Sequence, residues 1–158
     1  MAGASYDHSV IVGNVVGELR TALRGRCTVL PSDMKIRIEA TNRYVYPDAS
    51  VVCAAPEFVD EHRDAIKNPV VIVEVLSDST EAYDRGDKFE QYRTLASLQE
   101  FILVSQKQRK VEQFLRQPDG TWLLRALRDG DRLVIGSAGC EVAVDDLYLG
   151  ALGVAAPV

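Results

Sequence analysis

The sequence has few cysteines and no long apolar run, and both shortages exclude classes of protein. Its three cysteines, Cys27, Cys53 and Cys140, are widely spaced and lack a Cys-x-x-Cys or paired-histidine pattern. Neither a disulfide framework nor a zinc site is therefore indicated, and we expect buried free thiols. No segment approaches the roughly 20 uninterrupted apolar residues that a membrane span requires. The first eight residues contain no basic segment followed by an apolar run, so we predict a cytoplasmic protein without a membrane segment.

Positive charge is also scarce. The 158 residues include 18 Lys and Arg against 23 Asp and Glu, a formal net charge of −5. Proteins that coat nucleic acid electrostatically usually have a basic face, so this balance disfavours that class. It is compatible with an enzyme that has a local basic rim. The two small basic clusters, within residues 20–26 and 107–110, are expected to be solvated surface.

Several chemical motifs are absent. There is no Gly-rich phosphate loop, internal repeat or low-complexity block, and the serines and histidines form no recognisable nucleophile arrangement. His62 lies in a charged segment and is expected to be solvated, while Trp122 is expected to pack on a hairpin rather than stack on a base. The length fits a single domain, residues 1–158, with 150–158 as a loose tail. The remaining candidates for chemistry are carboxylates and cations.

The most informative residue that is present is Glu74. The other residues between 70 and 76 are all branched and apolar, the pattern of a strand that is covered on both faces. An isolated charge in that position would cost several kcal/mol unless a cation paired with it or it took up a proton. The sequence therefore predicts a metal ion, a lysine or an arginine beside Glu74, or a protonated carboxyl.

The helix expected at residues 83–95 directs two cations towards the same sheet. Its inward arc holds four apolar residues, Phe89, Tyr92, Leu95 and Ala96. Lys88 and Arg85 fall within this arc. The residues that fall outside it are Asp87, Glu90, Gln91 and Thr94. Either both side chains keep their charged groups in water, or one of them points at Glu74. Because the carboxylate is buried, we favour a cation that points at it. Such a contact is also compatible with an ion pair that is purely structural.

A second carboxylate, Asp48, follows a strand-breaking proline. Residues 44–53 are rich in aromatic and β-branched residues, but Pro47 cannot donate to a sheet and marks an edge or bulge. Bulges often redirect the next side chain, which here is Asp48. Glu18 lies at the margin of the apolar stripe on a helix expected at 9–24; it reaches either a site or water, and we favour water.

The order of the elements predicts the fold class. A strand at 70–76, a helix and a strand at 100–105 indicate a βαβ crossover with parallel pairing. Short strands are expected at 27–30 and 34–38, hairpin strands at 110–116, 121–127 and 132–135, and a last strand at 141–144. We therefore predict an α/β (α+β) protein with a mixed central sheet flanked by helices and with C-terminal β-hairpins.

This arrangement resembles that of a known family. The matching segments are Tyr46-Pro47-Asp48, Ile72-Val73-Glu74-Val75-Leu76-Ser77, the run from Tyr83 to Tyr92, and Glu100-Phe101-Ile102-Leu103-Val104. They are similar to the Uma2 family of restriction-endonuclease-like proteins in the PD-(D/E)XK nuclease superfamily. The resemblance covers residues 4–149. It implies a restriction-endonuclease-like αβββαβ core.

The sequence departs from the family pattern in three places. The superfamily motif would place a lysine at position 76, where this chain has Leu76; in the Uma2 family that function is thought to lie on the following helix, which points to Lys88. Relatives usually continue upstream of residues 1–5 with a short helix and hairpin, which this sequence lacks, and that bears on dimerisation and on the completeness of the cleft. The strand that commonly ends in Asp ends here in Ser105.

The resemblance implies a metal-dependent endonuclease. Asp48 and Glu74 would bind Mg²⁺, or Mn²⁺, with the Val75 carbonyl as a third ligand, and Lys88 would act in hydrolysis of DNA phosphodiester bonds. Arg85 would contact a phosphate or pair with Asp84 or Asp87, and Glu18 would either lie behind the metal-binding residues or contact a phosphate. A homodimer is compatible with this scheme. The alternative is a catalytically inactive nuclease-fold module for binding or assembly, and RNA or a nucleotide is an alternative substrate.

Overall fold

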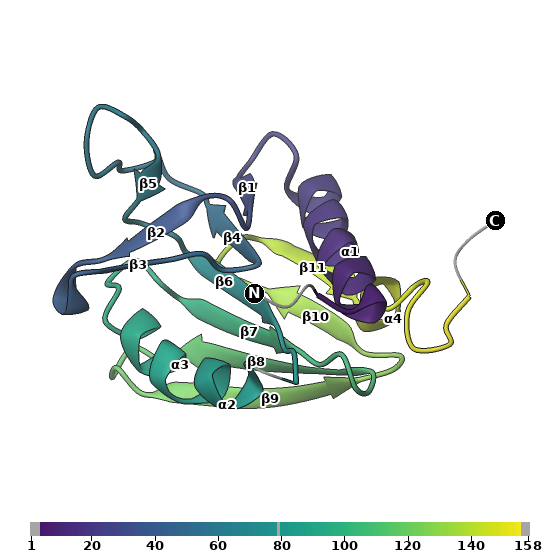
Figure 1. Ribbon diagram of the computed structural model, residues 1–158. Helices are drawn as coiled ribbons and strands as arrows, with labels where there is room; N and C mark the ends of the chain where they lie inside the picture. Colours follow the sequence, from purple (N-terminus) through teal and green to yellow (C-terminus); the bar gives the residue numbers. More distant parts are fainter. Residues whose placement is uncertain (1–3, 79, 156–158) are drawn as a thin grey trace.

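The computed structural model describes residues 4–78 and 80–155, and its central element is a six-stranded sheet (Figure 1). In spatial order the strands are β1 (Thr28–Pro31), β4 (Ala49–Val52), β6 (Val71–Val75), β7 (Glu100–Val104), β8 (Lys110–Arg116) and β9 (Trp122–Arg128). Strands β6 and β7 are parallel, whereas the other neighbours are antiparallel. The prediction of a mixed central sheet is confirmed.

The connection between β6 and β7 contains two short helices, α2 (Glu81–Arg85) and α3 (Asp87–Tyr92). The prediction of one continuous helix over 83–95 is wrong. Gly86 lies between them with φ −103° and ψ −94°, outside the helical region, so the axis breaks there. The crossover itself is present, and the parallel pairing that it predicted is confirmed.

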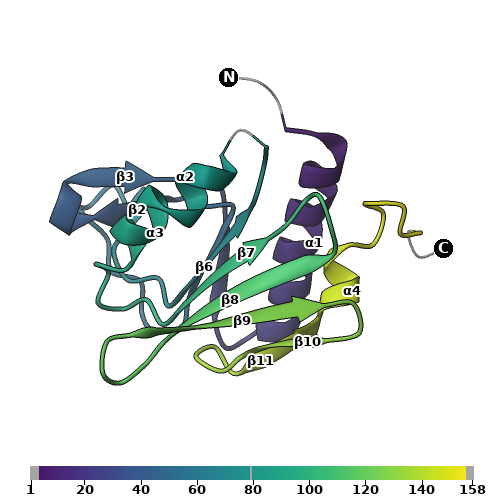
Figure 2. The same ribbon diagram turned by 90° about the horizontal axis from the view of Figure 1, so that it is seen from below.

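The N-terminal helix α1 spans Tyr6–Leu23 and covers one face of the sheet. It begins three residues before the predicted start because the Ser5 side chain caps it by accepting the backbone N–H of His8. Its buried residues recur every fourth position: Ile11, Val15, Leu19 and Leu23. Figures 1 and 2 show α1 beside the hairpin of β10 (Arg132–Ile135) and β11 (Cys140–Ala143), apart from α2 and α3.

Strand β6 separates two apolar clusters. Val71, Val73 and Val75 face the cluster that contains α1, while Ile72 and Leu76 face a cluster with α3. All five residues of the strand are buried, as its apolar pattern predicted. Because side chains alternate along a strand, Glu74 faces the α3 side.

A second, three-stranded sheet packs on the α3 side. It consists of β3 (Arg43–Val45), β2 (Lys35–Ile38) and β5 (Ala65–Ile66), and a short 3₁₀ helix, η1 (Glu39–Thr41), joins β2 to β3. Residues 46–48 connect β3 to β4, which belongs to the larger sheet. The strand expected over 44–53 is therefore two strands, and Pro47 lies at the crossing from one sheet to the other.

The C-terminal segment is packed, not loose. After α4 (Val144–Leu147), Ala151 is 1% exposed, and Leu152 and Val154 pack against the α1 cluster. The backbone N–H of Leu152 also donates to Asp7 Oδ1 at 3.3 Å. The expectation of a loose tail is wrong for residues 150–154, and residues 156–158 of that prediction lie outside the described part.

Cys27 and Cys53 form a disulfide between neighbouring strands. They stand opposite each other one step beyond the Thr28–Val52 pair of β1 and β4. The expectation of buried free thiols is wrong for both residues, and Cys140 is a free, half-buried thiol. Among the helices in the described residues, none is long and apolar enough to cross a membrane.

Candidate active site

Strands β4 and β6 bring two carboxylates together. Their antiparallel register pairs Ala49 with Val73, so the preceding residue, Asp48, lies opposite Glu74. Residues opposite each other in such a pair have Cβ atoms about 5 Å apart and point to the same face. The Val75 backbone N–H donates to Asp48 Oδ2 at 2.8 Å. Glu74 is 3% exposed, whereas the Asp48 side chain is 21% exposed and forms the more open edge of the site.

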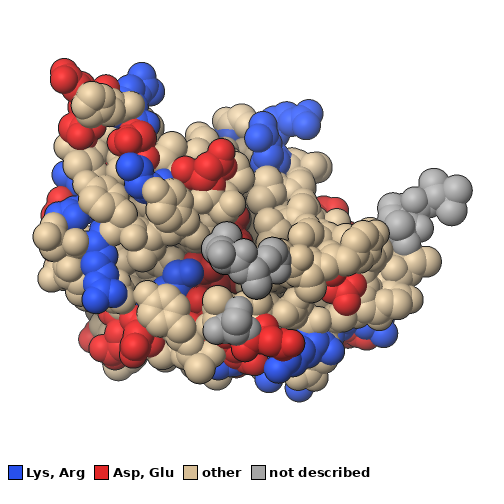
Figure 3. Space-filling view, viewed as in Figure 1, with Lys and Arg blue, Asp and Glu red and all other residues tan. Residues whose placement is uncertain are grey.

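Lys88 on α3 points at Glu74. Its Nζ lies 2.8 Å from Glu74 Oε1, and the side chain is 13% exposed. The Tyr92 hydroxyl, one helical turn later, donates to the same carboxylate oxygen at 2.8 Å. Of the two alternatives left open by the sequence, the structure has the directed cation. Figure 3 shows acidic and basic atoms recessed near the middle of this face.

Asp84 is a member of this cluster that sequence reasoning missed. Its buried carboxylate lies 3.5 Å from Lys88 Nζ and accepts the Thr80 hydroxyl at 3.0 Å. The available signal was its spacing, because residues four apart on a helix are neighbours. The sequence suggests Asp84 only as a partner for Arg85.

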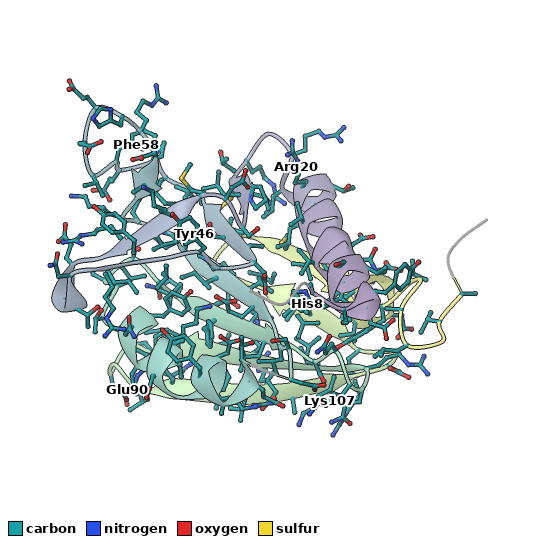
Figure 4. The ribbon with its side chains drawn as sticks, viewed as in Figure 1. His8, Arg20, Tyr46, Phe58, Glu90 and Lys107 are labelled. Atoms are coloured by element: carbon teal, nitrogen blue, oxygen red, sulfur yellow. A yellow bond between two sulfur atoms is a disulfide. The ribbon has the colours of Figure 1, made fainter. Side chains whose placement is uncertain are left out.

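His8 is the second missed residue, and it enters the site from α1 (Figure 4). Its Nε2 lies 3.1 Å from the carbonyl oxygen of Val75 and 3.8 Å from Asp48 Oδ2. The helix expected from residue 9 did not include it. Ser5 as a helix-capping residue was the signal that could have placed His8 in the first turn.

Two predicted site residues lie elsewhere. Among the described residues, Arg85 pairs with Glu112 on β8 and, at 3.2 Å, with Glu81, in place of the expected Asp84 or Asp87. Its pairing with these two glutamates leaves it directed at β8. Glu18 lies ten residues beyond His8 on α1, about 15 Å along the helix axis at 1.5 Å per residue. The structure therefore does not bring Arg85 or Glu18 into the cluster of Asp48, Glu74 and Lys88.

The electrostatics of the cluster show a shortage of positive charge. Burial raises the pKa of Glu74 to about 8; Lys88 lowers it, and Asp48 raises it further. Burial also raises the pKa of Asp48, against the effect of the Val75 N–H and His8. The pKa of Lys88 is lowered by burial but raised more by Glu74 and Asp84, so its net shift is upward. Glu74 and Asp84 thus share one lysine, which also acts on Asp48 electrostatically without pairing with it.

The donor atoms suit a hard cation. In the residues that the structure describes, no three His, Cys, Asp or Glu side chains form a metal-binding group. The two carboxylates of Asp48 and Glu74 and the Val75 carbonyl nevertheless make a set of oxygen donors, which is the type that Mg²⁺ takes while retaining several waters. A cation there would also relieve the repulsion that Asp48 and Glu74 exert on each other. The residues fit the expected metal on these two grounds.

Two proteins of a cyanobacterium are similar to this chain in sequence. The uncharacterized protein slr1290 of Synechocystis sp. is 39% identical over 151 residues, covering 95% of this chain and 78% of that protein. A second Synechocystis protein, sll1609, is 37% identical over 128 residues, covering 80% and 72%.

Among solved structures, a putative nuclease belonging to DUF820 from Anabaena variabilis matches with a TM-score of 0.76 and 13% identity, covering 93% of this chain and 83% of that one. The fold is accordingly that of the restriction-endonuclease-like proteins. Residues 1–145 match the Uma2 family, described as "Putative restriction endonuclease". This chain belongs to the Uma2 family.

Proposed function

We propose that the protein is a metal-dependent endonuclease that hydrolyses DNA phosphodiester bonds at the cluster of Asp48, Glu74 and Lys88. The observation that carries this proposal is the arrangement at the end of β6, where Lys88 contacts Glu74 and Asp84, and Asp48 lies opposite Glu74. Carboxyl groups with strongly shifted pKa values beside a specific charged partner are frequent at functional sites. The description of the Uma2 family supports the reaction class and DNA as substrate.

Asp48, Glu74 and the Val75 carbonyl would hold Mg²⁺ or Mn²⁺. When bound, such a cation lowers the pKa of a bound water and neutralises charge on a phosphate oxygen. Tyr92 holds the Glu74 carboxylate through its hydroxyl, and the Val75 N–H holds Asp48. These contacts preset the two carboxylates, so binding requires little reorganisation of the side chains.

Lys88 would act as a cation and not as a base. Its raised pKa keeps the ammonium protonated at neutral pH. Asp84 holds it on the side of α3 that faces β6. From this position Lys88 would orient the attacking water or stabilise charge that develops on the phosphate, an electrostatic role that a preorganised group performs well in a partly buried site.

One observation favours the alternative, a nuclease-fold module without catalysis. Lys88 Nζ lies 2.8 Å from Glu74 Oε1, so the lysine neutralises the charge of the glutamate directly, without a metal ion. Calorimetric titration with Mg²⁺ separates the two functions. Binding that is lost in Asp48→Asn supports the nuclease, whereas no binding by the wild-type protein supports the module.

The direct test is cleavage of supercoiled and linear DNA with Mg²⁺ or Mn²⁺. Wild type is expected to cleave, and Asp48→Asn and Lys88→Met are expected to lose roughly 10²-fold or more in rate. Glu141→Gln and Lys35→Met, two changes outside the cluster, serve as matched controls and should retain activity. Equal activity in all five preparations would indicate a contaminant and reject the proposal. Parallel assays with RNA and with a nucleotide diester test the substrate class.

The cytoplasmic location and the homodimer stay predictions.

A further inference from the structure

His8 is the one imidazole in contact with the proposed metal-binding residues. The other histidine of the sequence, His62, lies in the exposed loop between β4 and β5. The Nε2 atom of His8 is 3.1 Å from the Val75 carbonyl oxygen, and the geometry is that of a hydrogen bond. The contact joins two segments that are 67 residues apart in sequence, α1 and the end of β6.

The hydrogen bond fixes which nitrogen carries the hydrogen. A carbonyl oxygen only accepts, so Nε2 must be the donor; with the hydrogen on Nδ1 alone, two lone pairs would face each other across 3.1 Å. Nδ1 is buried and has no hydrogen-bond partner among the described residues. Because a nitrogen that donates a hydrogen bond has no lone pair left for a metal, the Nε2 atom that faces Val75 acts on this carbonyl and is not a metal ligand in this arrangement.

Both backbone polar groups of Val75 are consequently hydrogen-bonded. Its N–H donates to Asp48 Oδ2 at 2.8 Å, and its carbonyl accepts from His8. The next N–H, that of Leu76, donates to the Val104 carbonyl at 2.8 Å, which anchors the far end of the same peptide group. A carbonyl oxygen has two lone pairs, so the bond to His8 leaves one free for another partner.

The helix that carries His8 is itself fixed at this end. Ser5 accepts the His8 N–H at 3.1 Å, and its hydroxyl donates to Gln106 Oε1 at 2.7 Å in the β7–β8 turn. Ile11, one turn later, is fully buried in the core. The first turn of α1, which carries the imidazole, is therefore fixed in position.

We propose that His8 is a positioning residue of the metal site, which orients the Val75 carbonyl and holds Asp48 in register with it. This inference rests on the proposed function for its consequence, metal binding. Its structural part, the clamp on Val75, concerns the metal-free protein. Outer-sphere partners of this kind typically contribute 10-fold to 100-fold to metal affinity.

The test compares His8→Phe, which keeps a ring but has no donor, with His8→Gln, which restores an N–H at similar reach. His62→Gln is the matched control. Amide hydrogen exchange of Val75 and Leu76 is measured without metal, with the Ile102 amide in β7 as reference. Mn²⁺ affinity is measured by calorimetry. Thermal melting of each variant verifies that it is folded.

We expect His8→Phe to speed exchange at Val75 and Leu76 but not at Ile102, and to weaken Mn²⁺ binding roughly 10-fold. His8→Gln should recover most of both effects, and His62→Gln should match wild type. Unchanged exchange in His8→Phe, or unchanged Mn²⁺ affinity in a wild type that binds, would overturn the inference. A wild type that binds no Mn²⁺ rejects the proposed function, and the exchange result then decides the clamp alone.

Discussion

Two buried glutamates in neighbouring strands of the sheet are compensated in different ways. Glu100, in β7, is 2% exposed and accepts hydrogen bonds from the Gln113 side chain at 2.6 Å and from the Ser137 backbone at 2.9 Å. The Ser137 hydroxyl donates to it as well. Gln113 is fixed in turn, because it also donates to the Val134 carbonyl at 2.7 Å. All of these donors are neutral, and together they bond both carboxylate oxygens, which holds the group in one place.

Glu74, in β6, is equally buried but its compensation is charged and shared. Lys88 serves both Glu74 and Asp84, and Asp48 lies across the strand pair. The pKa of Glu74 therefore rises to about 8, chiefly through burial. Burial alone does not identify a functional carboxylate. Glu74 differs from Glu100 because its cationic partner, Lys88, also pairs with a second buried carboxylate, Asp84.

The largest expected difference between the two glutamates is in catalysis. Glu74→Gln should lower the rate of DNA cleavage roughly 10³-fold, because it removes a charged donor for the metal. Glu100→Gln should leave the rate within a few-fold, since it lies at the other end of its strand from the site. Initial rates of plasmid nicking with excess Mg²⁺ measure both. Comparable losses in the two variants would remove the distinction between the sites.

The next largest difference is in stability. Glu100→Gln should lower the free energy of unfolding by about 2 kcal/mol, because an amide NH₂ would face a donor from Gln113 or Ser137. Glu141→Gln, at an exposed pair with Arg132, should change it by less than about 0.5 kcal/mol. Urea denaturation measures both. If Glu100→Gln were as harmless as the control, the neutral network would not be a source of stability.

The hydrophobic pattern predicted the sheet well because β6 is a continuous apolar run and the hairpin strands are neighbours in the sequence. It failed at the helix, because Gly86 lies outside the helical region and separates α2 from α3. The wheel also placed Gln91 outside the inward arc, but it lies at the margin of that arc and is buried. The Cys27–Cys53 pair was missed since it depends on the register of β1 with β4, which no local spacing encodes.

The candidate site was predicted to the extent that its residues carry local signals. Glu74 is marked by the cost of burying a charge among branched residues, and Lys88 by helical periodicity. Asp48 is marked by the proline before it. His8 carries no such mark, because its role comes from the packing of α1 against a strand 67 residues away. Tertiary contacts of this kind cannot be read from one segment.

A third difference concerns pH. The pKa of Glu74 rises from 4.5 to about 8 on folding, so between these values the unfolded chain loses a proton that the folded protein keeps. Stability due to this group is complete below pH 4.5 and is lost as pH rises towards 8. Relative to Glu74→Gln, wild type should lose more than about 1 kcal/mol between pH 5 and 8. Urea denaturation at several pH values measures this. If the unfolding free energies of the two proteins changed equally with pH over this range, the assignment would be contradicted.

The smallest difference separates two buried tyrosines that each lose one hydroxyl. Tyr92 donates to Glu74 at 2.8 Å, whereas the Tyr148 hydroxyl lies 2.8 Å from the Ser105 and Lys110 carbonyls at the β7–β8 turn. Tyr92→Phe and Tyr148→Phe should each cost about 1 kcal/mol of stability in urea denaturation. Only Tyr92→Phe should also slow DNA cleavage, by roughly 3-fold to 10-fold, because Glu74 loses the group that orients it. Since the two changes delete the same atom from equally buried rings, a cleavage defect in both would assign the effect to stability and not to the orientation of Glu74.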